Sequence, residues 1–194
     1  VAREPRPGES FLDVGCGTGH FTRELARRTS GPVVGVDVNR TWLEYARRTG
    51  EASASYALAD ARALPFRDAS MDLVVAVMAL CFVPEEVAAV REIIRVTRRC
   101  LALSLLHRRS LLWWQKGRRG GQGGYRGARW HTVREARALF QSLPVRNLRV
   151  RTAIHLPAGG ECSKWFERMW PSGPPTGAFL LVTGDAAERT GTPA

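Results

Sequence analysis

The stretch of sequence that decides the fold is Leu12-Asp13-Val14-Gly15-Cys16-Gly17-Thr18-Gly19-His20-Phe21. It predicts a short strand over residues 11–15, a turn with three glycines, and a helix from about Thr18 to Arg28. Glycines let ligand atoms approach the backbone where a Cβ would collide. The start of the helix offers unpaired N–H groups and the positive end of the helix dipole, so the turn is suited to an anionic group.

An acidic residue, Asp37, follows the glycine turn at the end of the next predicted strand. The second predicted strand, Val33–Asp37, ends in a carboxylate 22 positions after Gly15, where an acid can accept both hydroxyls of a ribose. A lone G-x-G turn is equally compatible with a structural connection, and a lone Asp37 with a turn acid ahead of Thr41. Together, at this spacing, they favour a nucleoside site.

Strands and helices alternate around this turn. The expected helices cover 18–28 (with Phe21, Leu25 and Ala26 on one face), 41–48 (capped by Thr41, with Glu44 in capping-box spacing), 84–97 and 132–141. The expected strands cover 11–15, 33–37, 56–59, 73–78, 100–106, 145–152 and 179–183. The apolar run at 73–78 is typical of a parallel strand buried on both faces. This alternation predicts a doubly wound α/β sheet.

Composition narrows the class further. The 194 residues fit one domain, and 44% hydrophobic with 24% charged content is typical of a globular protein. No apolar run approaches the roughly 20 residues that span a bilayer, and the first ten residues do not form a signal peptide. Four cysteines, Cys16, Cys81, Cys100 and Cys162, form no C-x-x-C pair. The sequence therefore predicts reduced thiols in a cytoplasmic protein, with no metal site and no membrane partner.

The net charge of +11 is unevenly distributed. Between His107 and Arg134 there are eight Lys and Arg residues and no Asp or Glu, whereas the rest of the chain is nearly balanced, with 21 basic and 18 acidic residues. Residues 107–131 are also rich in glycine and aromatic side chains, so this basic segment is the second informative part of the sequence.

Four ordered motifs resemble those of a known family: LDVGCGTG at 12–19, VVGVDVN at 33–39, ALADARALPF at 57–66 and MDLVVAVMALCFV at 71–83. They resemble class I S-adenosylmethionine-dependent methyltransferases, specifically the type 11 branch that acts on small molecules. The G-x-G-x-G spacing favours this family over dinucleotide dehydrogenases. The resemblance implies a single domain over 1–184, with a Rossmann-like doubly wound sheet of about seven strands, mostly parallel with an antiparallel last strand, and a polar tail over 185–194.

The resemblance also implies a set of cofactor contacts. S-adenosylmethionine would be the cofactor and S-adenosylhomocysteine the product. The implied contacts are Asp13, Gly15 and Gly17 at the methionine end, with Cys16 beside them; Asp37 at the ribose; Val38, Asp60 and Ala61 around the adenine; and backbone at Val77 near the sulfonium. The alternative for Asp60 is a loop acid paired with Arg62.

The acceptor side is less defined. After the fourth strand the chain reads Met78-Ala79-Leu80-Cys81, without the Asn-Pro-Pro-aromatic signature of enzymes that methylate exocyclic amines. Relatives often have His where this chain has Cys81, which is expected to be a packed small residue. Methyl transfer mainly requires alignment and desolvation, so no catalytic residue is assigned.

The basic segment, residues 107–131, supplies the substrate candidates Tyr125, Trp130 and His131. It fits a loop over a small-molecule acceptor, or an RNA-binding surface that combines phosphate neutralisation with base stacking. The alternative without a binding role is a solvated loop, in which Trp113 and Trp114 pack in the core and the hydrogen bonds of His107 and His131 serve only the structure. A third class is a non-catalytic protein that binds S-adenosylmethionine.

Two further expectations concern segments at the margins of the motifs. Many relatives carry a helical lid before the first strand, and the chain begins too late to contain it. Trp165, Phe166 and Trp170 are expected to form an apolar helix face over the last strands. The sequence does not indicate an oligomeric state.

Overall fold

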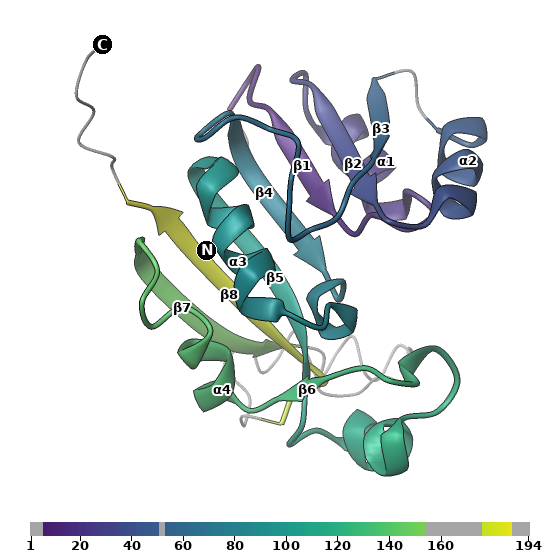
Figure 1. Cartoon of the computed structure of the whole chain (residues 1–194), viewed down its shortest axis with the longest axis vertical. Helices are drawn as coiled ribbons and strands as arrows, with labels where there is room; N and C mark the ends of the chain where they lie inside the picture. The colour runs from purple at the N-terminus through teal and green to yellow at the C-terminus, as the bar shows by residue number, and fades with distance from the viewer. Residues whose placement is uncertain (1–5, 51–52, 154–175, 188–194) are drawn as a thin grey trace.

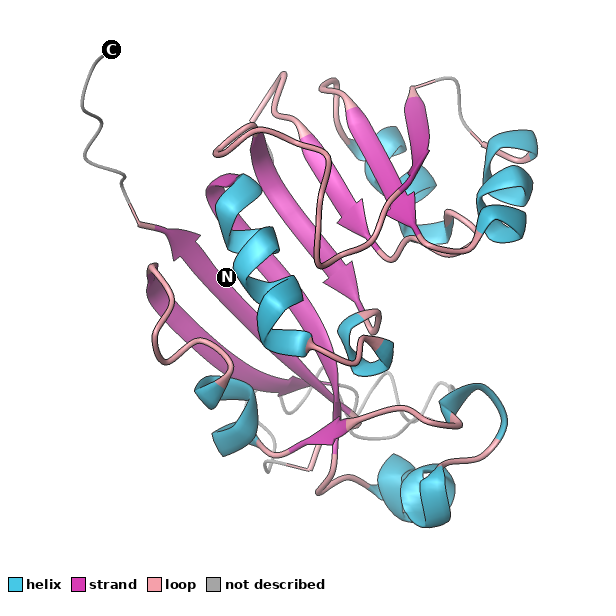
Figure 2. Cartoon of the chain, viewed as in Figure 1, coloured by secondary structure: helices cyan, strands magenta, loops and turns pink. Residues whose placement is uncertain are grey.

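The computed structural model describes residues 6–50, 53–153 and 176–187. Its centre is one twisted sheet with helices on both faces (Figures 1 and 2). The strands are β1 (Phe11–Val14), β2 (Val33–Asp37), β3 (Ala54–Leu58), β4 (Met71–Val77), β5 (Thr97–His107), β6 (Trp130–His131), β7 (Val145–Ala153) and β8 (Phe179–Ala186). The α-helices are α1 (His20–Arg28), α2 (Arg40–Arg48), α3 (Glu86–Val96) and α4 (Val133–Ala138).

The strand order is β3-β2-β1-β4-β5-β8-β7. The pairs from β3 through β5 are parallel, and β8 runs antiparallel to both β5 and β7. The predicted Rossmann-like sheet with an antiparallel last strand is therefore confirmed. The short strand β6 was not predicted: it pairs in parallel with Leu106 and His107 at the end of β5.

The register brings the informative strand ends to one edge. β1 lies between β2 and β4, with Val14 level with Val36 and Asp13 level with Val75. The chain winds outward from β1 to β3 and then crosses to β4 on the other side. In doubly wound sheets such a reversal opens a crevice at the carboxyl ends of the strands, where ligands bind. This edge is the place to examine for a site.

The core lies mainly between the sheet and α3. Val74, Ala76 and Leu103 of the central strands are fully buried, as are Ala89 and Ile93 of α3, which lies over β4 and β5 in Figure 1. The expectation that the fourth strand is buried on both faces was only half right. Its alternate residues 71, 73, 75 and 77 are half-buried, because side chains on successive positions point to opposite faces and the two faces are covered unequally.

Three local predictions were wrong at element boundaries. Thr41 does not cap α2; Asn39 does, with its side chain accepting from the N–H of Trp42 at 3.1 Å. Phe21 does not lie on the buried face of α1, since it is 45% exposed while Thr22 and Ala26 are buried. Helix α1 begins at His20 rather than Thr18, and Gly19 precedes it in the left-handed conformation.

The remaining boundaries shift by a few residues. β5 begins at Thr97, directly after α3, rather than at 100, and β8 continues to Ala186 rather than ending at 183. Helix α4 is shorter than predicted, and Thr132 and Glu135 form a reciprocal capping box at its start. The expected face of Trp165, Phe166 and Trp170 lies outside the described residues. In the part of the chain that the structure describes, no helix is long and apolar enough to cross a membrane.

Candidate functional site

A cavity of about 500 Å³ opens at the carboxyl ends of β1, β2 and β4. We call it the crevice. Its lining residues come from five stretches of the chain that are far apart in sequence: Val14, Gly15, Val36, Asp37, Val38, Trp42, Ala59, Asp60, Ala61, Val77, Met78, Ala79, Phe82, Val83 and Gly124. Six of the nine predicted cofactor contacts line it: Gly15, Asp37, Val38, Asp60, Ala61 and Val77. Its volume lies in the range usual for small-molecule sites.

The glycine turn forms one wall of the crevice. Gly15 has a φ of +71°, and a Cβ built on it would lie 2.2 Å from the Cβ of Ala79. The N–H groups of Gly15 and Cys16 both donate to the carbonyl oxygen of Val36, at 2.7 and 2.9 Å, which ties the turn to β2. Glycine at position 15 is therefore required twice, by the backbone conformation and by the close approach of the chain after β4.

Asp37 is held rigidly at the end of β2. Its Oδ2 accepts from the N–H of Gly17 and its Oδ1 from the N–H of Asn39, both at 2.8 Å. The side chain is only 7% exposed, yet it lines the crevice. A carboxylate oxygen has two lone pairs, so each oxygen retains one site for a hydroxyl donor. The carboxylate is thus pre-oriented by backbone alone.

Asp13 and Cys16 lie beneath the turn and do not line the crevice. Asp13 is 1% exposed, and its Oδ2 accepts from the hydroxyl of Thr22 at 2.7 Å. Burial raises the pKa of Asp13 to about 6, although the Thr22 hydrogen bond opposes the shift. Burial also raises the pKa of the Cys16 thiol to about 12. Both residues support the turn from beneath it. Gly17 also does not line the crevice, but its N–H donates to Asp37, which does.

Asp60 forms the ion pair that was considered as its alternative role. Arg62 grips the carboxylate from Nε, at 3.1 Å to each oxygen, and from Nη2 at 2.7 Å to Oδ2. These hydrogen bonds hold the pKa of Asp60 below its ordinary value. Asp60 nevertheless lines the crevice next to Ala61. The pair therefore fixes an acidic side chain at the rim rather than removing it from the site.

A second wall of the crevice is apolar and was not predicted. Met78, Ala79, Phe82 and Val83 follow β4 and line the crevice, and Trp42 faces it from α2. Met78 has a φ of +57°, a conformation that costs energy for a side chain of this size and that clusters at functional sites. Phe82 and Trp42 are each 50% exposed. Half-exposed large apolar side chains at a cavity mouth are typical of surfaces that a ligand covers.

Cys81 is a packed residue, as expected. Its thiol is 2% exposed and accepts from the N–H of Leu106 at 3.2 Å, and burial raises its pKa to about 12. A neutral buried thiol is a poor nucleophile.

The three substrate candidates of the basic segment do not line the crevice. Trp130 and His131 are buried in β6, and Tyr125 packs against Trp130 with ring centroids 5.7 Å apart. His131 Nε2 lies 3.0 Å from Oε2 of the buried Glu86, at the start of α3. The neighbour of Tyr125, Gly124, is the residue of this segment that reaches the crevice.

The tryptophans and the other histidine of the segment take different positions. Trp114 is 63% exposed under the guanidinium of Arg118, so the alternative that it packs in the core was wrong, whereas Trp113 packs against the core. His107 is buried, and its Nδ1 donates to the carbonyl oxygen of Gly177 at 2.8 Å. Both histidines are therefore hydrogen-bonded structurally.

Comparisons with known proteins agree with this geometry. Residues 12–100 match the family model described as a methyltransferase domain. The chain is 40% identical to the methyltransferase GfsG of Streptomyces halstedii over 96 residues. This aligned region covers 47% of this chain and 34% of that protein. It is 35% identical over 103 residues to the O-methyltransferase cnsE of Penicillium expansum, covering 50% and 37%. The chain thus spans little more than a third of the length of these curated relatives.

A solved structure resembles nearly the whole chain. A SAM-dependent methyltransferase of Thermotoga maritima, titled a possible histamine N-methyltransferase, superimposes with a TM-score of 0.73 at 22% identity, covering 93% of this chain and 84% of that one. At 22% identity, this likeness shows a shared fold and nothing beyond it. The match of residues 12–100 to the methyltransferase domain model and this likeness in fold agree with the resemblance to class I S-adenosylmethionine-dependent methyltransferases.

Proposed function

We propose that the chain binds S-adenosylmethionine in the crevice and transfers its methyl group to a small-molecule acceptor, releasing S-adenosylhomocysteine. The observation that carries the proposal is Asp37: a carboxylate oriented by two backbone N–H groups at the end of β2, directly beside the glycine turn. A ribose diol matches the two lone pairs that this carboxylate leaves open.

The crevice fits the rest of the cofactor. A nucleoside thioether needs an apolar slot for its base beside a polar grip for its sugar. Val38 and Trp42 border the slot, and Asp60 and Ala61 stand at its end with a carboxylate and a backbone N–H for the edge of the base. Gly15 lines the crevice on the side where the methionine end would lie. In this proposal Asp13 and Cys16 support the turn from beneath it.

The chemistry requires placement more than proton transfer. S-adenosylmethionine supplies a methyl group on a positive sulfur, which leaves as a neutral thioether while a lone pair of the acceptor takes the methyl and the acceptor loses its proton to solvent. Val77 and Met78 lie at the end of β4, where that methyl is expected. The apolar wall from Met78 to Val83 excludes water from the approaching acceptor, which raises its reactivity.

The acceptor side favours a small molecule with apolar surface. Ala79, Phe82 and Val83 give the acceptor an apolar wall, and the relatives include O-methyltransferases such as cnsE. The three cysteines in the described residues are free thiols, which supports a cytoplasmic location.

The deciding experiment has two stages. Calorimetry measures binding of S-adenosylmethionine and S-adenosylhomocysteine. A radiolabelled-methyl assay then tests transfer into the RNA, protein and metabolite fractions of a cell extract. Label in the metabolite fraction supports the proposal. Cofactor binding with no label in any fraction favours the non-catalytic alternative, and no cofactor binding overturns the assignment.

One observation favours RNA as a second candidate acceptor. Arg118 lies over the exposed ring of Trp114, with its guanidinium carbon 5.6 Å from the ring centroid, and stacked cations with exposed aromatics are suited to nucleic acid. Binding of unrelated RNAs with a steep salt dependence, reduced by replacing Arg118 and Arg119, would support this candidate.

A further inference from the structure

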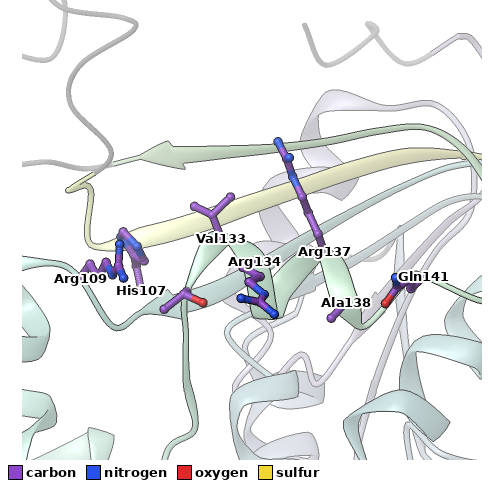
Figure 3. A pocket seen from close by; sticks show the side chains of 8 residues that line it. His107, Arg109, Val133, Arg134, Arg137, Ala138 and Gln141 are labelled. Carbon is purple, nitrogen blue, oxygen red and sulfur yellow. The ribbon is translucent and has the colours of Figure 1, made fainter.

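A second cavity among the described residues, larger than the crevice, lies away from it. It has a volume of about 900 Å³ and is lined by His107 at the end of β5, by Arg109 just after it, and by residues of α4 and its flanks, among them Arg134 and Arg137. Figure 3 shows these side chains and the elements from which they come. In the described part of the chain this cavity, which we call the arginine cavity, shares no lining residue with the crevice.

Strand β6 separates the two cavities. β8 occupies one side of β5 at Leu106, where Leu106 pairs with Phe179. β6, which also pairs with Leu106, must therefore lie on the other side, beyond the end of β4 at Val77. The chain passes from β6 into α4, whose residues line the arginine cavity, whereas Gly124 ahead of β6 lines the crevice. The arginine cavity is thus a site of its own.

The net charge of the protein comes from residues 107–151, a stretch that includes the lining of this cavity. Residues 107–151 hold twelve Lys and Arg residues and one acidic residue, Glu135, which leaves 17 residues of each sign in the rest of the chain. This basic excess attracts anions to the part of the protein that residues 107–151 form, the cavity included.

The single acid of that stretch is already fully engaged. Oε1 of Glu135 pairs with Arg108, and Oε2 accepts from the backbone N–H and the hydroxyl of Thr132 in the capping box. Among the described residues, no carboxylate lines the arginine cavity. Glu135 therefore leaves the cations of the cavity uncompensated.

Three arginines of the cavity have no partner in the described residues. The side chains of Arg109, Arg134 and Arg137 form no hydrogen bond or ion pair there, whereas that of the neighbouring Arg108 is paired. Arg134 and Arg137 stand three residues apart on α4, so they lie on the same helix face. Guanidinium groups present a planar fork that matches the oxygens of a phosphate or a carboxylate.

We propose that the arginine cavity is a second binding site, which takes a phosphate monoester with an apolar body. A dianionic phosphate neutralises more of the charge of three guanidinium groups than a carboxylate does. The remaining lining is largely apolar, from Val133, Ala138 and the methylene groups of the arginine side chains. These groups would pack against the apolar part of the ligand. A concave site of this kind favours an inserted ligand group over an extended nucleic-acid strand.

Calorimetry with phenyl phosphate, inorganic phosphate and benzoate at fixed ionic strength tests the site. Phenyl phosphate is expected to bind most tightly, because it alone combines the dianion with an apolar ring. The double variant Arg134→Gln/Arg137→Gln is expected to weaken its binding by about tenfold or more. The matched control Arg149→Gln/Arg151→Gln removes the same charge from exposed positions on β7 and should change binding less than about twofold.

Several outcomes would overturn the proposal. Equal losses in the two double variants would reduce the effect to general attraction, and the absence of saturable phenyl phosphate binding would remove the site. RNA binding that falls equally in both variants, without phenyl phosphate binding, would assign the charge to nucleic acid. All four arginines are exposed, and circular dichroism checks that the variants fold. Affinity for S-adenosylmethionine, measured on the same variants, should stay constant. The proposals for the crevice and for the arginine cavity are therefore tested independently.

Discussion

The two ends of the sheet edge differ in how they hold their polar groups. Around the crevice, backbone N–H groups orient the carboxylate of Asp37, and Thr22 holds that of Asp13. Around the arginine cavity the cations have no such partners. The first region is pre-organised for one ligand shape, while the second offers charge without fixed geometry. From this difference we expect cofactor binding in the crevice to need little rearrangement of side chains, and anion binding in the arginine cavity to order its guanidinium groups.

The largest expected effect is at Asp37, in the pre-organised region. Replacing it with alanine removes both acceptors for the ribose and both acceptors that fix the turn, so affinity for S-adenosylmethionine should fall by about two to three orders of magnitude. Calorimetry measures the loss. Glu24→Ala, which removes one exposed negative charge on α1, serves as the control and should leave affinity within about twofold. Unchanged affinity in Asp37→Ala would withdraw the ribose assignment.

The glycine turn gives the next largest effect. Gly15→Ala introduces a Cβ 2.2 Å from that of Ala79 at a φ of +71° and should lower the free energy of unfolding by about 3–5 kcal/mol. Gly8→Ala is the matched control, because Gly8 also has a positive φ of +80° but nothing within 4 Å of its added Cβ. It should cost about 1 kcal/mol.

Urea denaturation measures both glycine variants. A second substitution, Ala79→Gly, removes the colliding methyl group and should restore part of the loss in Gly15→Ala. If the two glycine variants lose equal stability, the close approach of Ala79 has no energetic weight, and the turn is constrained by backbone conformation alone.

These first two predictions rest on the part of the site that the sequence could predict. The order of strands, the glycine turn and Asp37 follow from local patterns, because periodicity and backbone requirements are properties of short segments. The cap of α2 was assigned to Thr41 for the same local reason. It moves to Asn39 because the N–H of Asn39 donates to Asp37, a contact that holds this residue in extended conformation just outside the helix.

The apolar wall and the arginine cavity could not be predicted in this way. Trp42 and Phe82 are apolar residues within apolar patterns, and only the packed fold leaves them half-exposed at a cavity mouth. Phe21 was expected inside for its helix spacing, yet Thr22 points toward the sheet because Asp13 binds its hydroxyl. β6 has two residues, too few for a periodic signal, and its position depends on β5 extending past the end of β4.

The pH dependence of stability tests the buried carboxyl group of Asp13, which lies beneath the glycine turn. The pKa of Asp13 is about 6 in the folded chain against an ordinary value of 3.8. Folded protein therefore holds this proton more tightly than unfolded protein, and the resulting stability is complete below about pH 4 and lost as the pH rises through 6. The ionised carboxylate costs on the order of 3 kcal/mol at pH 8. Asp13→Asn should be free of this loss.

Unfolding in urea between pH 4 and 8 measures the difference between Asp13→Asn and the unaltered protein, which should widen with pH in favour of the variant. Glu92→Gln, followed from pH 5 downward, gives the opposite sign. The hydrogen bond from Arg95 lowers the pKa of Glu92 below its ordinary 4.5, so the stability that Glu92 contributes is present above that value and lost as the pH falls. A constant difference for Asp13→Asn would mean that burial does not shift this carboxyl.

The smallest expected effect tests how the basic segment is held between the two regions. Oε2 of the buried Glu86 lies 3.0 Å from Nε2 of His131 and 3.2 Å from Nη1 of Arg129. His131→Leu removes the buried partner and should cost about 1–2 kcal/mol. Arg108→Gln breaks an exposed pair with Glu135 and should cost less than about 1 kcal/mol. Both losses are read from urea unfolding.

The functional consequence of His131→Leu follows from where β6 lies. Weakening its attachment to α3 should speed hydrogen exchange at residues 123–131 and slow methyl transfer, because Gly124 borders the acceptor end of the crevice. Affinity for S-adenosylmethionine should stay within about twofold, since Asp37 and the glycine turn lie on other elements. A loss of cofactor affinity equal to the loss of transfer would mean that the two regions act as one unit, against the division argued from their contacts.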